Sequence, residues 1–334
     1  MPVQLKREQF LRKLVQVSPG LATRELLEQA ASFVFKDGDI VTFNDEIFCS
    51  THFESGITGA IHAAPLLALL NKMTDEDISI EAGENELLVI GKRSRAGIRM
   101  SSEILLPTDT VEKSDTWADL HNEFGDALEV VQGSASKDDL HFNLTCIHLS
   151  PKFVEACDGY QLTRYNIETG LKHNCLIKRD SAKRIVGLGM SQVSEGKNWI
   201  HFRSTDLQIS CRRWVQDYLN LDEMIDFKGK PTTLPGGLAE AVEKAEIFSS
   251  DNAAENQVLV EMKQGKLRLK GEGAHGWYVE QKKIAYEGAP ITFLISPKLL
   301  TEITKRTNDC EITTDRLKID AGKFVFVACL AIPE

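Results

Sequence analysis

Apolar residues recur along the chain in a pattern that occurs three times, at intervals of about 116 residues. Three segments carry this pattern, and they are anchored at Ile61, Ile177 and Ile295. Further apolar residues follow, mostly at offsets of five, eight and nine from each anchor, and those offsets fall on one face of an α-helix. Each segment is therefore predicted to be the end of a strand that leads into an amphipathic helix.

A β-hairpin and a further helix precede each of these segments. The hairpins are predicted from pairs of apolar runs separated by short polar turns at 36–38, 150–152 and 264–266. The six predicted helices are Lys6–Val17, His62–Met73, Asp119–Val131, Lys178–Gly189, Leu238–Phe248 and Ser296–Thr307. Strands joined by short turns form antiparallel sheets, so the predicted fold class is α+β, with three tandem units. The expected domains are 1–115, 116–228 and 229–334.

A glycine string between Gly271 and Gly276 has the spacing G-x-G-x-x-G of a dinucleotide-binding turn. Such a turn must open a helix, because the pyrophosphate lies on free N–H groups at a helix N-terminus. The residues that follow Gly276 are aromatic and β-branched, which is typical of a strand. The string is therefore predicted to connect a β-hairpin, and no nucleotide cofactor is expected.

Composition narrows the functional classes further. The chain has 334 residues, 42% of them hydrophobic and 26% charged, with a net charge of −10. No apolar run approaches the ~20 residues of a membrane span, and the charged N-terminus lacks the apolar core of a secretory signal. Seven cysteines and eight histidines are scattered without a zinc-ligand spacing. We expect a cytoplasmic protein with reduced thiols and no metal or cofactor.

Three stretches carry a resemblance that extends over nearly the whole chain. They are LKREQFLRKLVQVSPGLATR at 5–24, GKRSRAGIRM at 91–100 and EACDGYQLTRY at 155–165. On these stretches the chain resembles the DNA polymerase III β subunit family, the bacterial-type DNA polymerase sliding clamps, and within it a phage or divergent member. The chain departs from the family pattern at Cys157, at Tyr160-Gln161 and in its C-terminal residues.

The resemblance implies a ring of two copies joined head to tail. In such a homodimer, three tandem DNA-clamp domains per chain place antiparallel sheets outside and helices around a central hole. Double-stranded DNA passes through the hole and is bound independently of sequence. The implied protein is a non-catalytic processivity factor, which binds DNA polymerase and the clamp loader through short apolar motifs. Those motifs enter a pocket between the second and third domains.

The charge distribution agrees in sign with this interpretation. The six predicted helices together are weakly positive, so the rest of the chain carries more than the whole negative net charge. A lining less acidic than the outside attracts phosphates regardless of base sequence. The predicted helix at 119–131 is an exception, because it carries four acidic residues and no lysine or arginine.

The resemblance also assigns candidate residues to three sites. The predicted DNA contacts are Arg24, Arg12, Lys13, Lys72, Lys178 and Arg179. The predicted pocket for partner peptides is lined by Phe142, Cys157, Gly159, Tyr160, Leu162, Leu219, Met224, Val327, Cys329 and Leu330. The predicted dimer interface contains Arg95, Ile98, Arg99, Ile247 and Phe248, with the arginines facing acidic residues.

Two other classes of protein remain as alternatives. A clamp-fold interaction or decoy protein would bind replication partners without encircling DNA, and the acidic stretch 119–131 would suit it. A cysteine-dependent enzyme has little in its favour, because Cys157, Asp158 and Gly159 are more typical of a turn after a strand. A dimeric mass in solution favours the ring over the decoy protein.

Overall fold

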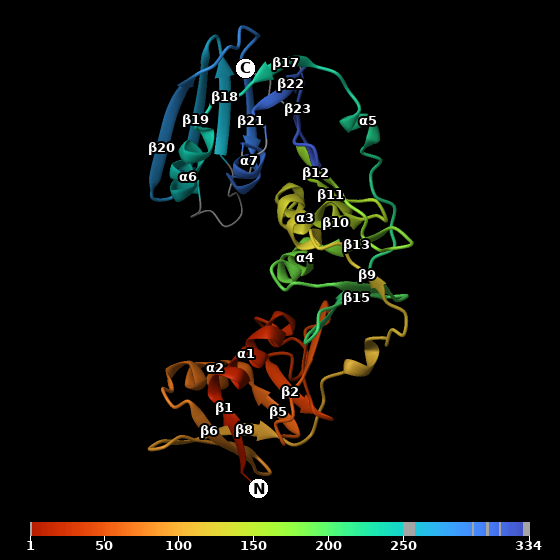
Figure 1. The fold of residues 1–334 in the computed structure, drawn as a ribbon, viewed down its shortest axis with the longest axis vertical. Coiled ribbons are helices and arrows are strands. Elements are labelled where there is room, and N and C mark those ends of the chain that lie inside the picture. Colours follow the sequence, from red (N-terminus) through yellow and green to blue (C-terminus); the bar gives the residue numbers. More distant parts are fainter. Residues whose placement is uncertain (1, 250–257, 296, 305–306, 314, 330–334) are drawn as a thin grey trace. The chain divides into compact units, whose positions relative to one another are not determined.

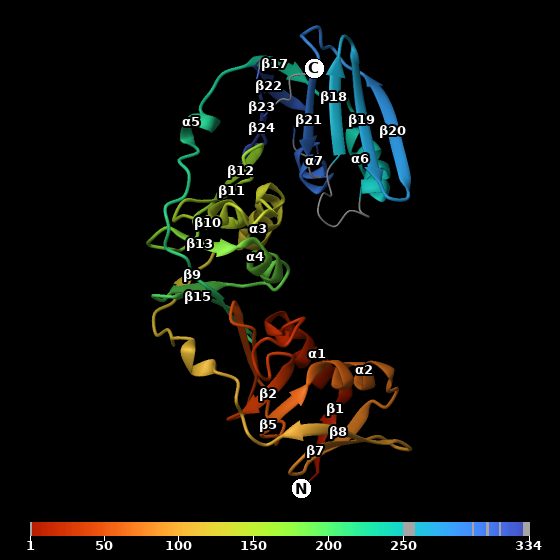
Figure 2. The same cartoon turned by 180° about the vertical axis from the view of Figure 1, so that it is seen from behind.

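The chain forms two compact units in the computed structural model (Figures 1 and 2). The first unit comprises Met1–Asn122 with Gly187–Trp214, and the second comprises Glu123–Val186 with Val215–Glu334. The structure describes residues 2–249, 258–295, 297–304, 307–313 and 315–329. Within those ranges, no helix has both the length and the apolar character needed to span a bilayer.

The first unit is built on one antiparallel sheet of twelve strands, in the order β1-β6-β7-β8-β5-β2-β3-β4-β16-β15-β14-β9. Its strands are β1 Val3–Lys6, β2 Ser32–Lys36, β3 Asp39–Phe43, β4 Ile47–His52, β5 Gly59–His62, β6 Asp77–Ala82, β7 Glu86–Ile90, β8 Arg95–Ser101, β9 Ala118–Asp119, β14 Gln192–Glu195, β15 Trp199–Arg203 and β16 Gln208–Arg212. Helices α1 (Arg7–Val17) and α2 (Ala63–Lys72) bury apolar stripes, and Phe10, Leu14 and Leu66 in these stripes are fully buried. The short helices η1 (Ser18–Gly20) and η2 (Thr108–Thr110) lie in connections.

The second unit contains two antiparallel sheets, an eight-stranded one in the order β13-β10-β11-β12-β24-β23-β22-β17 and a four-stranded one in the order β20-β19-β18-β21. The strands are β10 Cys146–Leu149, β11 Phe153–Cys157, β12 Gln161–Asn166, β13 Cys175–Lys178, β17 Lys230–Thr233, β18 Val258–Lys263, β19 Lys266–Gly273, β20 Gly276–Lys283, β21 Ile291–Ile295, β22 Asp309–Ile312, β23 Arg316–Asp320 and β24 Phe324–Cys329. The helices are α3 Phe124–Val131, η3 Gln132–Ser134, η4 Phe142–Thr145, α4 Arg179–Ile185, α5 Asp222–Ile225, α6 Leu238–Ser249 and α7 Pro297–Thr304.

The α+β class and the antiparallel sheets are confirmed, but two predicted helices were too long. The helix expected at 119–131 begins only at Phe124, because Asp119 belongs to β9 and pairs with β14. The carboxylate of Glu123 accepts hydrogen bonds from Lys323 and from the hydroxyl of Tyr165, so the acidic stretch is not one continuous helical face. The helix expected at 178–189 ends at Ile185, and left-handed glycines follow it.

The glycine string is a hairpin connection, as predicted. Strands β19 and β20 pair antiparallel from Lys266 with Lys283 to Gly273 with Gly276, and no helix follows. Helix α6 lies against these two strands (Figure 1). A Cβ atom at Gly271 would lie 2.0 Å from the carbonyl oxygen of Ala245, so the glycine is needed for this close approach.

The threefold repeat appears in the register of the strands. Phe43 pairs with Phe48 across one hairpin of the first unit, and Cys157 pairs with Leu162 across the equivalent hairpin of the second. The second strand of each hairpin then pairs with a strand that comes much later in the chain. Phe48 lies opposite Ser210 in β16, and Leu162 lies opposite Val327 in β24. We call these two pairings the β4–β16 joint and the β12–β24 joint.

The joints explain why the two units do not follow the expected domains. Strands β14, β15 and β16, which fall in the predicted domain 116–228, continue the sheet of the first unit through the β4–β16 joint. The predicted middle domain is therefore divided between the two units. The boundaries at 1–115, 116–228 and 229–334 stay a prediction, based on the repeat.

Candidate functional site

The predicted partner pocket corresponds to an apolar cluster on one face of the eight-stranded sheet. Cys157, Leu162 and Val327 lie side by side on β11, β12 and β24, and each is at most 2% exposed. Leu221 and Met224 reach them from the segment 215–229, which we call the second linker. The remaining apolar neighbours are Tyr218, Ile225, Phe227 and Val325. The structure therefore brings together four of the predicted pocket residues, namely Cys157, Leu162, Met224 and Val327.

The other predicted pocket residues lie at the border of this cluster or elsewhere. Tyr160 is 79% exposed and Leu219 is 51% exposed, so both present apolar surface to solvent. The backbone N–H of Cys329 donates to the carbonyl oxygen of Tyr160 at 2.7 Å. Gly159 has a φ of +94°, which glycine adopts without strain. Phe142 is in η4, where the ammonium of Lys178 lies 5.9 Å from its ring centroid, and Leu330 is outside the described residues.

A buried polar network, which the sequence analysis missed, fastens the second linker to the sheet. The carboxylate of Glu155, 1% exposed, lies 2.7 Å from Nδ1 of His148 and accepts a hydrogen bond of 2.7 Å from Nε of Arg164. The same guanidinium donates to Asp222 on α5 at 2.7 Å and stacks 4.2 Å above the ring centroid of Phe153. These charges are paired because an unpaired buried charge is costly. In the sequence, the only signal is that charged residues occur on consecutive predicted strands. The register of these strands must be known before their side chains can be predicted to meet.

The thiols of Cys157 in the cluster and of Cys329 on β24 are held in their neutral form. Burial raises the pKa of Cys157 to about 11, and burial likewise raises the pKa of Cys329. The hydroxyl of Tyr218 accepts the N–H of Cys157 at 3.0 Å, and burial raises the pKa of this phenol as well. At neutral pH the cluster therefore contains no ionised thiol or phenol, which suits its apolar surroundings.

The predicted DNA contacts differ in their accessibility. In the first unit, Arg12 on α1, Lys72 on α2 and Arg24 in the loop after η1 are exposed. Lys13 is 8% exposed, and its ammonium donates to the hydroxyl of Thr51 at 3.1 Å and lies 3.7 Å from Asp206. This ammonium group would have to leave both partners to reach a phosphate. In the second unit, Lys178 and Arg179 are half-buried, and Arg179 donates to the carbonyl oxygen of Gln132 at 3.1 Å.

The predicted interface residues lie on two different elements, β8 and α6. Arg95 and Arg99 are exposed on one face of β8, whereas Ile98 points to the core and is 8% exposed. On α6, Ile247 is 66% exposed, and the half-buried ring of Phe248 stacks on Tyr278 with centroids 6.5 Å apart. Trp277 on β20 is 62% exposed, although the sequence analysis did not single it out.

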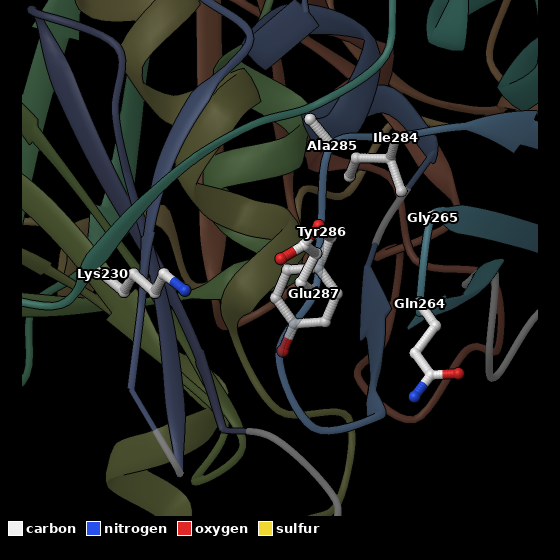
Figure 3. A pocket seen from close by; sticks show the side chains of 7 residues that line it. All are labelled: Lys230, Gln264, Gly265, Ile284, Ala285, Tyr286 and Glu287. Carbon is white, nitrogen blue, oxygen red and sulfur yellow. The ribbon is translucent and has the colours of Figure 1, made fainter.

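A separate cavity of about 610 Å³ opens in the second unit, and its lining contains none of the predicted site residues. Figure 3 shows Tyr286 and Glu287 between Lys230 and Gln264. The hydroxyl of Tyr286 donates to the carbonyl oxygen of Ala289 at 2.6 Å, so this group is already satisfied. Across the parts of the chain that the structure describes, no cluster of three or more His, Cys, Asp or Glu is arranged to hold a metal.

These features define a class of fold, in which tandem units of helix, hairpin, helix and sheet are joined edge to edge. It is the fold of bacterial DNA polymerase III β subunits, the DNA polymerase sliding clamps. The chain is similar over 100% of both lengths to the β subunit from Thermotoga maritima, with 16% identity and a TM-score of 0.75. It covers 99% of its length and 100% of the β chain from Streptococcus pneumoniae, with 16% identity and a TM-score of 0.76.

A third similar structure contains a ligand. It is a sliding clamp from Pseudomonas aeruginosa bound to griselimycin, and it is matched over 100% of both chains with 14% identity and a TM-score of 0.75. No protein-family model matches the sequence, and no curated protein matches it either. The similarity is therefore one of fold, and it is found at sequence identities of 14% to 16%.

Proposed function

We propose that this protein is a DNA sliding clamp, a non-catalytic processivity factor that encircles duplex DNA as a head-to-tail homodimer. The observation that carries the proposal is that, among the described residues, one hairpin strand and part of one later strand lack the partner that their equivalents have in the other repeats. Each repeat contributes the second strand of its hairpin and a strand near its C-terminal end. Within the chain, these strands pair in two joints, β4 with β16 and β12 with β24. The hairpin strand β20 and residues 95–99 of β8 are the two that remain, and each pairs on one side only among the described residues.

The internal joints also give the register of the proposed third joint. In the hairpin of the last repeat, Trp277 holds the position that Phe48 and Leu162 hold in the first two. In the strands that these residues face, Gly97 holds the position of Ser210 and Val327. Trp277 of one copy would therefore lie opposite Gly97 of another.

This pairing has favourable chemistry. Gly97 has no side chain of its own, the carboxylate of Glu86 lies over it, and Arg95 and Arg99 flank it on the exposed face of β8, so the exposed indole would lie among these three side chains. Arginine side chains stack well on tryptophan, at about 0.5–2 kcal/mol for each cation–π contact. The new backbone hydrogen bonds would satisfy both free edges. Two such joints close a ring through a twofold axis.

DNA binding in this proposal is electrostatic and independent of sequence. The exposed cations Arg12, Arg24 and Lys72 of the first unit are its first candidates, with Lys178 and Arg179 in the second unit. A ring needs little affinity, because its topology retains it on DNA, and weak phosphate contacts permit sliding. Lys13 would serve only after releasing Thr51 and Asp206.

The apolar cluster beneath the second linker is the proposed partner site. DNA polymerase and the clamp loader would place a short apolar motif at the border of this cluster, against the partly buried Met224, with Cys157, Leu162 and Val327 buried behind it. The half-exposed Leu219 and the exposed Tyr160 at its border would be covered by the motif. Aromatic, leucine and methionine side chains of this kind are frequent anchors in binding sites.

The decisive test is retention on DNA of different topology. We expect the protein to remain on closed circular DNA and to be lost after linearisation, with a solution mass near twice 37.2 kDa. Trp277→Asp should weaken the dimer about 30-fold or more, as for a central aromatic hot spot. Val215→Asp, at another exposed apolar residue, is the matched control. A strict monomer that still binds polymerase would instead support the interaction or decoy protein.

Two further substitutions separate the DNA and partner sites. Arg24→Ala should lower loading on DNA and leave the dimer mass unchanged, and an unaltered loading rate would remove Arg24 from the DNA site. Leu162→Asp should abolish binding of an apolar partner peptide, because a charge would enter a residue that is 1% exposed. Full retained affinity would place the partner site elsewhere.

A further inference from the structure

The first unit contains a cavity that no part of the proposed function uses. It has a volume of about 700 Å³ and lies between the sheet at the β4–β16 joint and residues 108–115, which belong to the segment 102–117 that we call the first linker. Its apolar lining comes from Val41, Phe48 and Val111. Its charged lining consists of five carboxylates against two lysine ammonium groups, so the cavity is acidic.

The threefold repeat shows what occupies the equivalent space in the second unit. His148, Glu155 and Arg164 form a row across β10, β11 and β12. The same row in the first unit is Val34, Val41 and Ser50 across β2, β3 and β4. The arginine that fills the space beneath the second linker is thus replaced by a serine beneath the first, and Ser50 lines the cavity.

The carboxylate that meets the arginine is nevertheless present in both linkers. Arg164 donates to Asp222, which opens the single helical turn α5. The first linker has a single helical turn at the same point, η2, and this turn contains Asp109. Asp109 is exposed at the cavity, and no ion pair joins it to another described residue. Asp39 also lines the cavity, at the position where Phe153 stacks on Arg164, and its Oδ1 lies 3.0 Å from Nδ1 of His52, so its other carboxylate oxygen is the one proposed for a guanidinium.

We infer that this cavity receives an arginine side chain from a basic segment of a partner protein. The guanidinium would take the place that Arg164 takes in the second unit, between the carboxylates of Asp39 and Asp109 and beside Phe48. Planar guanidinium groups bind carboxylates in pairs, and their stems pack on apolar surface. The inference does not depend on ring closure or on DNA, because all of its residues belong to the first unit.

The test titrates the full-length protein with the peptide Ac-Gly-Arg-Gly-NH₂ and follows the valine methyl signals by NMR. We expect the methyls of Val41 and Val111 to shift, whereas those of Val154 and Val325 in the second unit stay in place. The control peptide carries citrulline, which has the shape of arginine without its charge, and should bind about tenfold more weakly. Equal binding of the two peptides would overturn the proposal.

Two variants locate the site. Ser50→Arg supplies the missing side chain from within the chain and should abolish peptide binding, while Ser102→Arg, an exposed serine of the first linker, should not. Asp109→Asn alters one exposed carboxylate without disturbing the core and should weaken binding about tenfold. Unchanged binding by both Ser50→Arg and Asp109→Asn would refute the site, even if the protein encircles DNA as proposed.

Discussion

The buried carboxylate of Glu155 makes the sharpest energetic prediction. Its side chain is 2% exposed and receives Arg164 at 2.7 Å, so replacing Arg164 with leucine leaves a buried charge with His148 alone. Breaking one side of a buried ion pair costs about 3–5 kcal/mol. Asp222 contacts the same guanidinium but is 68% exposed, and such a pair contributes about 0–1 kcal/mol. Arg164→Leu should therefore lower the free energy of unfolding of the second unit strongly, whereas Asp222→Asn should change it very little.

Hydrogen exchange followed by mass spectrometry measures this loss of stability separately for the second unit. Each 1.4 kcal/mol changes an equilibrium about tenfold, so amides of β11 and β12 should exchange about 100- to 3,000-fold faster in Arg164→Leu. Amides of β3 in the first unit serve as the internal control. The double variant Glu155→Met/Arg164→Leu should recover most of the protection, since no charge remains. An increase below fivefold in Arg164→Leu would refute the argument that Glu155 is a buried, paired charge.

Three further outcomes are expected. Burial lowers the pKa of His201, so the unfolded state binds a proton on this residue more readily than the folded state does. As the pH is lowered from about 6.5, the free energy of unfolding of the first unit should therefore decrease, by at most about 1.4 kcal/mol per pH unit. Thermal denaturation at several pH values should show this dependence in the original protein and not in His201→Asn. Iodoacetamide at pH 8 should alkylate buried Cys157 more slowly than half-buried Cys329, as judged by peptide mass spectrometry; equal rates would contradict a thiol pKa of about 11 at Cys157. Gly271→Ala should cost about 1–3 kcal/mol in urea unfolding because its Cβ would overlap α6, while Gly125→Ala, in open space, should not.

Much of the fold was readable because the repeated pattern is local. Apolar periodicity and turn residues located the hairpins, and the six helices were found although two were drawn too long. The error at 119–131 arose because Asp119 pairs with β14, a contact more than seventy residues away that local propensity does not encode. At the other helix, left-handed glycines after Ile185 ended it earlier than its charges suggested.

The candidate sites were less predictable, because they depend on strand register. The structure brought Cys157, Leu162 and Val327 together on neighbouring strands, as the resemblance implied. Sequence reasoning missed the pairing of Glu155 with Arg164, since strands are needed to align residues nine positions apart. Lys13 was assigned to the DNA site through the resemblance, and the structure shows that this lysine is buried and donates to the hydroxyl of Thr51 within the first unit.

The β4–β16 joint has a consequence for how the polypeptide is made. Ile47 meets Cys211 across this joint, so the first sheet is completed only by residues synthesised long after its first half. Until they leave the ribosome, β4 exposes an open row of amide and carbonyl groups, and closing so long a loop is slow. A nascent chain that stops at residue 115 would therefore expose an unpaired strand edge at β4. We expect this chain to aggregate during translation, whereas a chain extended through Arg212 should not.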